Sequence, residues 1–306
     1  MPEVGPATAP RRCGYVAVVG APNAGKSTLT NRLVGAKVSI VTPKVQTTRA
    51  RITAIAIHGA SQIVFVDTPG IFRGARRRLE RAMLQAAWGG AEDADVVLLL
   101  VDARRGHDDD TRAIVEGLQR QGRPAVLALN KIDLVKRPAL LGLAAELNRA
   151  GAFSETFMIS ALDGDGVDDL ARYMAGIVPE GPWLYPEDQL ADVSERLLAA
   201  EATREQLFLN LHEELPYELT VTTEAWQERK DGSVRIEQIV YVAREGHKAI
   251  VIGKRGQMIA RIGAAARAEL GRMLGRTVHL SLFVKVRPGW ADEPERYREM
   301  GLEYPR

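Results

Sequence analysis

Two loops of this chain combine glycines with basic side chains, a pairing that suits phosphate groups. The first runs from Gly20 to Thr28 and reads GAPNAGKST, which fits the pattern G-x-x-x-x-G-K-[ST]. The second, from Gly253 to Gly256, reads GKRG. Glycines let backbone N–H groups approach phosphate oxygens, and the basic side chains supply positive charge. The segments around each loop indicate whether the two bind the same kind of molecule.

The first loop has the surroundings of a nucleotide site. It follows the strand-like run YVAVVG and precedes a helical stretch, as a phosphate loop requires. Lys26 would reach the β and γ phosphates, Ser27 would ligate Mg²⁺, and the N-terminus of the helix would add positive potential. We expect seven residues of this loop to contact the nucleotide, namely Gly20, Asn23, Ala24, Gly25, Lys26, Ser27 and Thr28.

The tetrapeptide NKID at residues 130–133 indicates that the base is guanine. The Asp133 carboxylate can accept both the N1–H and the exocyclic N2–H of guanine, donors that adenine lacks. Lys131 can lie over the base, and Asn130 can tie this loop back to the phosphate loop. A further expected contact follows the strand-like run ETFMI and consists of Ser160, Ala161 and Leu162. The backbone N–H of the middle residue could serve guanine O6.

Two more segments predict Mg²⁺ and γ-phosphate contacts. In VDTPG, Asp67 at a strand end can hold Mg²⁺ through water, and Gly70 lets a backbone N–H meet the γ-phosphate. The segment QTTR at residues 46–49 offers a hydroxyl for Mg²⁺ in the triphosphate state, with Thr48 preferred over Thr47. We therefore expect the catalytic set Lys26, Thr48, Asp67 and Gly70, and the metal ligands Ser27, Thr48 and Asp67.

Ile71 follows Gly70 at a place where many small GTPases carry a glutamine that orients water. An isoleucine cannot orient or polarise water, so we expect slow intrinsic hydrolysis. Asn23 offers a substitute, because its amide oxygen could coordinate K⁺ near the phosphates. The alternative is that Asn23 only holds a turn of the loop.

The second loop lacks the surroundings of a nucleotide site. No strand precedes it, and no serine or threonine follows its lysine. A G-x-x-G loop between two helices with a strand afterwards is the KH arrangement, in which the backbone approaches a single strand of about four nucleotides. Residues 244–287 carry ten basic and two acidic side chains, which suits a polyanion. We expect RNA contacts from Ile250, Gly253, Lys254, Arg255, Gly256 and Ile259.

The elements that must position these loops fall into two groups. Near-continuous apolar runs such as DVVLLLVDA and PAVLALNK alternate with helical stretches, which is typical of a buried parallel sheet. This predicts a doubly wound α/β domain with ligands at the carboxyl ends of its strands. Three prolines in residues 179–186 mark a linker. Beyond it we expect a helix from Ser194, its N-cap, to Pro216, then an α-β-β-α-α-β order.

These patterns divide the chain into four parts: a tail at 1–12, a GTPase domain at 13–180, a linker at 181–190, and a type II KH domain with a C-terminal extension at 191–306. The chain has 306 residues, 46% of them hydrophobic, enough for two cores. A single cysteine fits a reducing compartment, and no signal-like apolar segment opens the sequence. We therefore expect a cytoplasmic protein.

The G-x-P-N-x-G-K-S, Q-T-T-R, D-T-P-G, N-K-x-D and S-A-L motifs, followed by one KH-type loop, resemble the bacterial Era GTPases over about residues 14–290. This resemblance implies a monomeric switch using GTP or GDP and Mg²⁺. It implies binding to the 3′ end of 16S ribosomal RNA during maturation of the 30S subunit. It also implies peripheral contact with the inner membrane and no DNA partner. Related GTPases with two nucleotide domains, or with a C-terminal cysteine motif, match less well.

Two other functions are compatible with parts of the sequence. An RNA-binding scaffold that senses GTP without significant turnover would suit Ile71. A metabolic P-loop kinase would share the first loop, but NKID and the KH-type segment argue against it.

Overall fold

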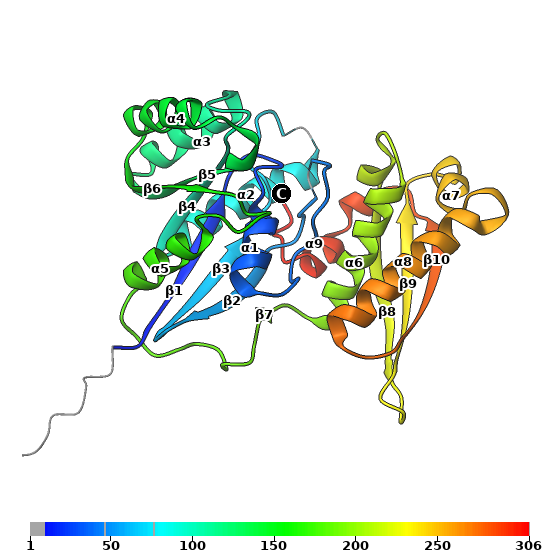
Figure 1. Cartoon of the computed structure of the whole chain (residues 1–306). Coiled ribbons are helices and arrows are strands. Elements are labelled where there is room, and N and C mark those ends of the chain that lie inside the picture. The colour runs from blue at the N-terminus through cyan, green and yellow to red at the C-terminus, as the bar shows by residue number, and fades with distance from the viewer. Residues whose placement is uncertain (1–9, 46, 76, 306) are drawn as a thin grey trace, which may run out of the picture. The chain divides into compact units, whose positions relative to one another are not determined.

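The computed structural model describes residues 10–45, 47–75 and 77–305, and Figure 1 shows the course of the chain. These residues form two compact units. The first comprises residues up to Val38, together with Arg51–Ala75 and Met83–Asp192. The second comprises Ser39–Ala50, the stretch 77–82 and Val193 onwards. Two short stretches from the first half of the sequence therefore group with the C-terminal half.

The first unit is built on a seven-stranded sheet with the order β6-β5-β4-β1-β3-β2-β7. Its strands are β1 (Arg12–Val19), β2 (Ile52–His58), β3 (Ser61–Asp67), β4 (Val96–Asp102), β5 (Ala125–Asn130), β6 (Phe153–Ile159) and β7 (Ala191–Asp192). The contiguous strands β6, β5, β4, β1 and β3 are parallel. The sequence pattern did not predict β2, which pairs antiparallel with both β3 and β7.

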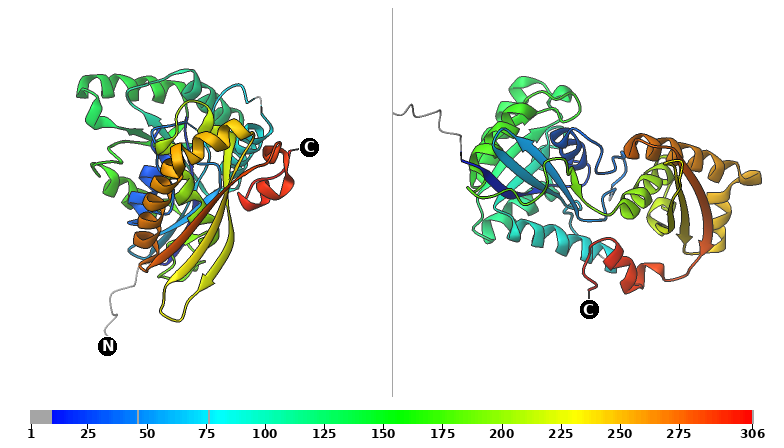
Figure 2. Two further views of the ribbon diagram at one scale, coloured as in Figure 1. Left: turned by 90° about the vertical axis from the view of Figure 1, so that its right-hand side faces the viewer. Right: turned by 90° about the horizontal axis from the view of Figure 1, so that it is seen from below.

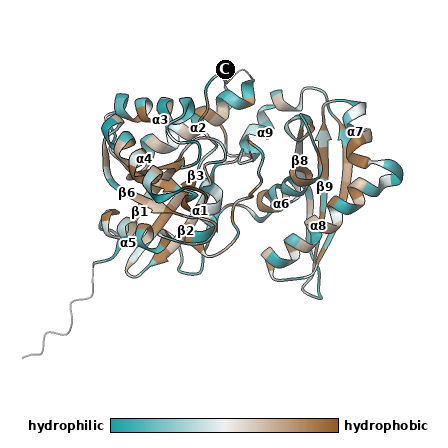
Figure 3. Ribbon diagram, turned by 45° about the horizontal axis from the view of Figure 1, so that its top comes forward, coloured by the Kyte–Doolittle hydropathy of each residue, from teal (hydrophilic) through white to brown (hydrophobic). Residues whose placement is uncertain are grey.

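Helices cover both faces of this sheet (Figure 2), as a doubly wound fold requires. They are α1 (Lys26–Val34), α2 (Arg78–Asp93), α3 (Asp109–Arg120), α4 (Arg137–Ala150) and α5 (Val167–Ile177). Alternate strand residues point to opposite faces. One set packs with α1 and α5 and includes Val16, Val18, Leu98 and Leu100. The other packs with α2, α3 and α4 and includes Ala17, Val19, Leu99 and Val101. Figure 3 shows these strands as predominantly hydrophobic.

The predicted linker 181–190 belongs to the first unit. The side chain of Gln62 on β3 accepts hydrogen bonds from the backbone N–H groups of Leu184 and Tyr185 at 2.9 and 3.0 Å. Leu190 accepts a backbone hydrogen bond from Ile55 of β2. Prolines prevented a regular helix there but did not prevent packing, and the division between the units falls after Asp192.

The second unit contains a three-stranded sheet of order β10-β9-β8. Its elements are α6 (Glu195–Asn210), β8 (Leu219–Glu228), β9 (Val234–Val242), α7 (Glu245–Ile252), α8 (Gln257–Leu274), β10 (Val278–Val286) and α9 (Pro294–Glu299). The antiparallel hairpin β8–β9 and the parallel pair β9–β10 match the predicted α-β-β-α-α-β order. Figure 2 shows α8 and α9 on different sides of this sheet.

Helix α6 begins as predicted but ends early. Ser194 is its N-cap, accepting a hydrogen bond from Leu197 N–H at 3.2 Å. The helix ends at Asn210, well before Pro216, which lies in a separate 3₁₀ turn. Buried positions run without a break from Ala199 to Glu205, so this part of the helix is buried on all its faces. Four of these buried residues are polar or charged, namely Glu201, Thr203, Arg204 and Glu205.

The C-terminal extension packs against the second unit. Trp290, Tyr297 and Leu302 are all at most 4% exposed. The indole N–H of Trp290 donates to the carbonyl of Glu218, and the Tyr297 hydroxyl donates to the carbonyl of Ala291. These aromatic rings therefore complete the core and are not available to stack on RNA bases.

Candidate nucleotide and RNA sites

The phosphate loop follows β1 directly and enters α1. Two of its glycines have backbone angles that suit only glycine: φ is 158° at Gly20 and 101° at Gly25. A Cβ at Gly20 would lie 2.4 Å from the carbonyl oxygen of Leu100, and one at Gly25 would lie 2.2 Å from Nδ2 of Asn130. The loop is therefore packed closely against the ends of β4 and β5. This packing leaves room for main chain only, as a loop that wraps phosphates requires.

Lys26 lies at the start of α1 and is only 6% exposed. Its Nζ donates to the carbonyls of Gly20 and Ala21, both at 3.1 Å, so the ammonium group sits over the loop. Burial lowers the pKa of Lys26 to about 8, although the nearby Asp67 carboxylate acts in the opposite direction. A buried cation held at the loop is chemically suited to polyphosphate.

Asn130 joins the NKID segment to the phosphate loop and to the SAL segment. The sequence predicted the first of these two links. Asn130 Nδ2 donates to the carbonyl of Ala24 at 2.8 Å, which ties the NKID segment to the phosphate loop. Its Oδ1 accepts from the N–H of Ala161 at 2.9 Å, which ties in the SAL segment. The Ala161 donor is thus engaged within the protein. Contact between that N–H and guanine O6 remains a prediction and requires this donor to be shared.

The NKID and SAL segments present their side chains differently. Lys131 has φ 66°, and the next residues, Ile132–Leu134, form a 3₁₀ turn that leaves Asp133 exposed. Ser160 is 1% exposed and braces its own loop through Asp163, whereas Leu162 is 71% exposed. Arg32 of α1 donates to the carbonyls of Ala161 and Leu162. The SAL segment, which is expected to contact the base, is therefore held by hydrogen bonds within its own loop and by hydrogen bonds from α1.

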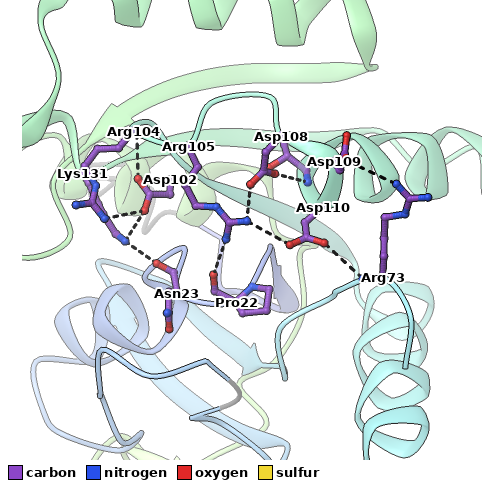
Figure 4. A network of polar contacts seen from close by, with 11 residues as sticks. Pro22, Asn23, Arg73, Asp102, Arg104, Arg105, Asp108, Asp109, Asp110 and Lys131 are labelled. Atoms are coloured by element: carbon purple, nitrogen blue, oxygen red, sulfur yellow. Dashed lines mark hydrogen bonds and ion pairs between the residues drawn. The ribbon is translucent and has the colours of Figure 1, made fainter. Parts of the chain in front are cut away.

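A network of charges fixes Lys131, and Figure 4 shows it beside the phosphate loop. Lys131 Nζ donates to the carbonyl of Asn23 at 2.5 Å and to the carboxylate of Asp102 at 2.6 Å. Burial alone raises the pKa of Asp102, but hydrogen bonds from Lys131 and Arg104 more than offset this, so the pKa is lowered. Asp102 ends β4, and no motif in the sequence predicted its contact with Lys131. Its position at the carboxyl end of a buried parallel strand was the available signal.

Arg105 extends the same network towards α3. It donates to the carbonyl of Pro22 at 3.3 Å and pairs with Asp108 and Asp110 at 2.6 and 3.3 Å (Figure 4). Asp108 is also the N-cap of α3, accepting from Thr111 N–H at 2.8 Å. The backbone of the phosphate loop is thus supported from β4 and α3.

Asp67 and Gly70 flank the phosphate loop on its other side. Asp67 ends β3 and is completely buried. A Cβ at Gly70 would lie 2.9 Å from the backbone of Pro22, and Ile71 N–H donates to the carbonyl of Gly20 at 3.1 Å. Ile71 itself is 4% exposed and belongs to the core. Its side chain is therefore directed into the protein, in agreement with the expectation that it does not orient water.

Asn23 has φ 63°, a left-handed conformation that asparagine tolerates better than most residues. This supports the alternative that Asn23 holds a turn. Coordination of K⁺ by its side chain remains a prediction.

Mg²⁺ prefers oxygen ligands in octahedral geometry. Ser27 at the start of α1 and Asp67 at the end of β3 supply a hydroxyl and a carboxylate of that kind. Thr48, 7% exposed, lies in the stretch that groups with the second unit. Thr47 Oγ1 shares a hydrogen bond with Thr42 and donates to the carbonyl of Lys44. Thr48 as the third ligand stays a prediction. Gln46, the first residue of that motif, lies outside the described residues.

The GKRG loop has the conformation of a tight link between two helices. Residues Lys254–Gly256 form a 3₁₀ turn between α7 and α8. Gly253, Arg255 and Gly256 have φ values of 72°, 52° and 76°. Lys254 and Arg255 are exposed at its tip. The loop thus offers backbone and two cations to solvent, as contact with a sugar–phosphate chain requires.

The two apolar residues expected to contact RNA beside this loop differ in exposure. Ile250 is 56% exposed, and Ile259 is half-buried against the core. Val251 is completely buried, so it cannot contact a base. Among the other basic residues on α8 and just after it, Arg276 pairs with Glu228 and Arg272 pairs with Glu269, whereas Arg261 and Arg267 are exposed.

Known proteins match this combination of sites. Residues 15–131 match a family model described as 50S ribosome-binding GTPase, and residues 214–291 match a KH domain model. GTPase Era of Rhizobium meliloti is 61% identical over 297 residues, 97% of this chain and 95% of that protein. GTPase Era of Dinoroseobacter shibae is 62% identical over 299 residues, 97% of each. The chain belongs to the Era family of GTPases.

Solved structures of the Era family agree with this assignment. A variant of Aquifex aeolicus Era bound to GDP and AlF₄⁻ is 39% identical, with a TM-score of 0.89. Era in complex with MgGDPNP and nucleotides 1506–1542 of 16S ribosomal RNA is 38% identical, with a TM-score of 0.90. Each match covers 95% of this chain and 99% of the other. The predictions of a GTP-hydrolysing enzyme, of its fold and of GTP or GDP with Mg²⁺ are confirmed.

Among the described residues, no helix has the length and apolar character needed to cross a membrane.

Proposed function

We propose that this Era-family GTPase binds 16S ribosomal RNA near its 3′ end through the GKRG loop, and that it assists maturation of the small ribosomal subunit in the cytoplasm. One observation carries the proposal: a loop that exposes Lys254 and Arg255 links two helices of the second unit. A related protein, Era, has been solved in complex with nucleotides 1506–1542 of that RNA. A monomeric state and peripheral contact with the inner membrane are parts of the same proposal.

The site residues fit this division of labour. Asp133 and Lys131 recognise guanine, and Lys26 and the loop from Gly20 to Thr28 hold the phosphates. Ser27, Thr48 and Asp67 hold Mg²⁺, which neutralises charge on the β and γ phosphates. RNA recognition uses the backbone of Gly253 and Gly256, the charges of Lys254 and Arg255, and the apolar surfaces of Ile250 and Ile259.

RNA binding to the GKRG loop is tested by reversing the charge at its tip. In Lys254→Asp with Arg255→Asp, we expect affinity for an RNA of nucleotides 1506–1542 to fall by at least tenfold in fluorescence anisotropy, since both phosphate-facing cations are lost. Affinity for GDP should not change. The control is Arg229→Asp with Lys230→Asp, which reverses two exposed basic residues in the turn between β8 and β9. Equal loss of RNA affinity in both variants would contradict the assignment.

The glycines require a separate variant because they act through backbone conformation. Gly253→Asp with Gly256→Asp should abolish RNA binding and leave GTP binding intact. A side chain at Gly253 would meet Cβ of Met258 at 2.6 Å, so the fold of this variant must be verified by circular dichroism. Undiminished RNA affinity in a folded variant would refute the KH assignment.

A further inference from the structure

The segment Ser39–Ala50 is unusual because its two ends and its middle belong to different units. The chain leaves the first unit at Val38 and returns to it at Arg51, and the residues between them pack with the second unit. In sequence the segment connects α1 to β2. It also contains Thr48, the proposed Mg²⁺ ligand of the triphosphate state.

Arg49 is buried in the second unit, with 2% of its surface exposed. Its guanidinium donates to the carbonyl of Leu219 at 2.8 Å and to that of Pro216 at 3.2 Å, and Tyr217 accepts a longer bond at 3.4 Å. These carbonyls belong to the 3₁₀ turn before β8 and to the first residue of that strand. A planar guanidinium can serve several acceptors at once, which a lysine cannot do.

Arg204 of α6 holds the segment from the other side of Thr48. It is 2% exposed, pairs with Glu201 through Nε at 2.8 Å, and donates through Nη2 to the backbone carbonyl of Thr47. The Arg49 and Arg204 guanidinium carbons lie 5.6 and 5.1 Å from the ring centroid of Phe208. Both cations therefore share one buried aromatic ring.

The rest of the segment is also attached to α6. Val41 N–H donates to the Glu205 carboxylate at 2.8 Å. Lys44 Nζ donates to the carbonyls of Phe208 and Leu211, at the C-terminal end of the helix, where a positive charge is favourable. Thr42 and Thr47 share a hydrogen bond of 2.6 Å, which braces the loop internally.

Burying two arginine side chains costs more free energy than a simple connection between a helix and a strand requires. Burying a guanidinium is unfavourable without hydrogen bonds and a counter-charge, and two such groups close together repel each other. Burial and the charge of Arg204 lower the pKa of Arg49 to about 9, and Glu201 opposes the effect. A loop that only joined α1 to β2 would need none of this.

We propose that Arg49 and Arg204 are positioning residues that couple Thr48 at the nucleotide site to RNA binding by the second unit. Thr48 lies between Thr47 and Arg49, and consecutive Cα atoms are about 3.8 Å apart, so Thr48 cannot move far unless both anchored neighbours follow. A state in which Thr48 ligates Mg²⁺ therefore affects the second unit, and by reciprocity RNA on that unit affects Thr48. This inference rests on the proposed RNA-binding function.

A second stretch of the chain gives weaker support to the same inference. Residues 77–82, which follow the DTPG loop, also group with the second unit. Arg77 pairs with Glu218 at 2.7 Å, and Arg78 pairs with Asp292 at 2.9 Å. These pairs are partly exposed and contribute little individually, so the buried anchors of the first stretch carry the inference.

The test measures the coupling itself. Affinity for an RNA of nucleotides 1506–1542 is determined with the protein saturated by GDPNP or by GDP, and the ratio of the two dissociation constants is the coupling factor. Couplings between sites usually amount to about 5- to 150-fold. In Arg204→Met with Glu201→Gln, which removes both charges of the buried pair, we expect this factor to fall to within about twofold of one.

Three companion variants separate coupling from folding. Lys44→Met leaves no buried charge unpaired, because its acceptors are carbonyls, and should reduce the factor partially. Arg204→Lys keeps the positive charge beside Glu201 but loses the planar guanidinium that binds Glu201 and the carbonyl of Thr47 together. It should therefore also reduce the coupling factor. Arg235→Met with Glu237→Gln removes an exposed ion pair on β9 and should keep the wild-type factor. In every variant that circular dichroism shows to be folded, GDP affinity should stay close to wild type, because Thr48 is expected to ligate Mg²⁺ only in the triphosphate state.

The outcomes distinguish this inference from the proposed function. RNA binding without any nucleotide dependence in the wild-type protein would overturn the coupling while leaving RNA recognition intact. Absence of RNA binding would overturn the proposed function as well. A wild-type coupling factor that persists in the Arg204–Glu201 variant would overturn the role of these residues. If that variant fails to fold, unchanged factors in both Lys44→Met and Arg204→Lys would overturn it.

Discussion

We expect single residues to decide which nucleotide this GTPase accepts and how tightly it holds the phosphates. Asn130 joins the phosphate loop to the SAL segment through bonds of 2.8 and 2.9 Å, and the Lys131–Asp102 contact holds the base-facing loop. These contacts fix the loop that carries Asp133. Substitutions at Asp133 should therefore change the choice of base without disturbing the site.

Asp133→Asn should weaken GTP binding and confer binding of xanthosine triphosphate. The amide retains one acceptor but opposes the N2–H pairing of guanine, whereas xanthine offers an oxygen at that position. Sites that depend on such pairing discriminate by up to roughly 10⁴–10⁵-fold. Competition of both nucleotides against a fluorescent GDP analogue measures the change. Unchanged GTP affinity would contradict the role of Asp133.

Nucleotide affinity should depend on pH through Lys26. Its pKa of about 8 lies below its ordinary value of 10.5, and a bound phosphate raises it again. Binding therefore takes up a proton above pH 8, and GDP affinity should fall as pH rises from 7 to 9.5, by at most about tenfold per pH unit. Titrations of a fluorescent GDP analogue at several pH values measure this. Lys26→Met should bind weakly with a flat profile, and a flat wild-type profile would contradict the prediction.

At the scale of elements, the strand ends and the helix starts supply the functional groups. β1, β3 and β5 each end at a loop that carries predicted residues of the nucleotide site, and β4 ends at Asp102, which binds Lys131. In the second unit, α6 begins at an N-cap that the sequence predicts, and charged side chains are buried in the middle of the helix. The start of this helix is set locally, whereas its burial is set by its partners.

Ser194→Ala should destabilise the first turn of α6. The hydroxyl accepts the N–H of Leu197, and loss of such a cap costs about 1 kcal/mol. Hydrogen exchange in residues 195–198 should accelerate about fivefold, as that free energy implies, while exchange in α8 stays unchanged. Ser194→Asp retains an acceptor and serves as the control. Equal protection in the alanine variant would show that packing alone fixes this turn.

For the whole molecule, turnover should be slow in isolation and faster on the ribosomal subunit. Ile71 is part of the core and leaves the attacking water without a glutamine, so catalysis lacks one of its usual groups. A single-turnover assay of GTP hydrolysis with and without small ribosomal subunits measures the difference. The charge-reversed variant at Lys254 and Arg255 should lose the acceleration. Equal rates under both conditions would contradict a switch that responds to its RNA.

The sequence by itself determined the nucleotide chemistry, the KH-type order and most elements. Phosphate loops, NKID and G-x-x-G act through backbone conformation and adjacent residues, so their spacing along the chain carries the information. The α6 N-cap and the β8–β9 hairpin were predictable for the same local reason. Family resemblance then followed from the motifs taken together.

Only the tertiary structure showed where Arg49, Arg204 and Asp102 act. Each depends on groups distant in sequence: Arg49 on the carbonyls of Pro216 and Leu219, Arg204 on Thr47, and Asp102 on Lys131. Nothing local distinguishes a buried arginine from a solvated one, so the sequence did not reveal the buried charges of α6. The membership of Ser39–Ala50 in the second unit likewise arises from long-range packing and leaves no periodic signal in the sequence.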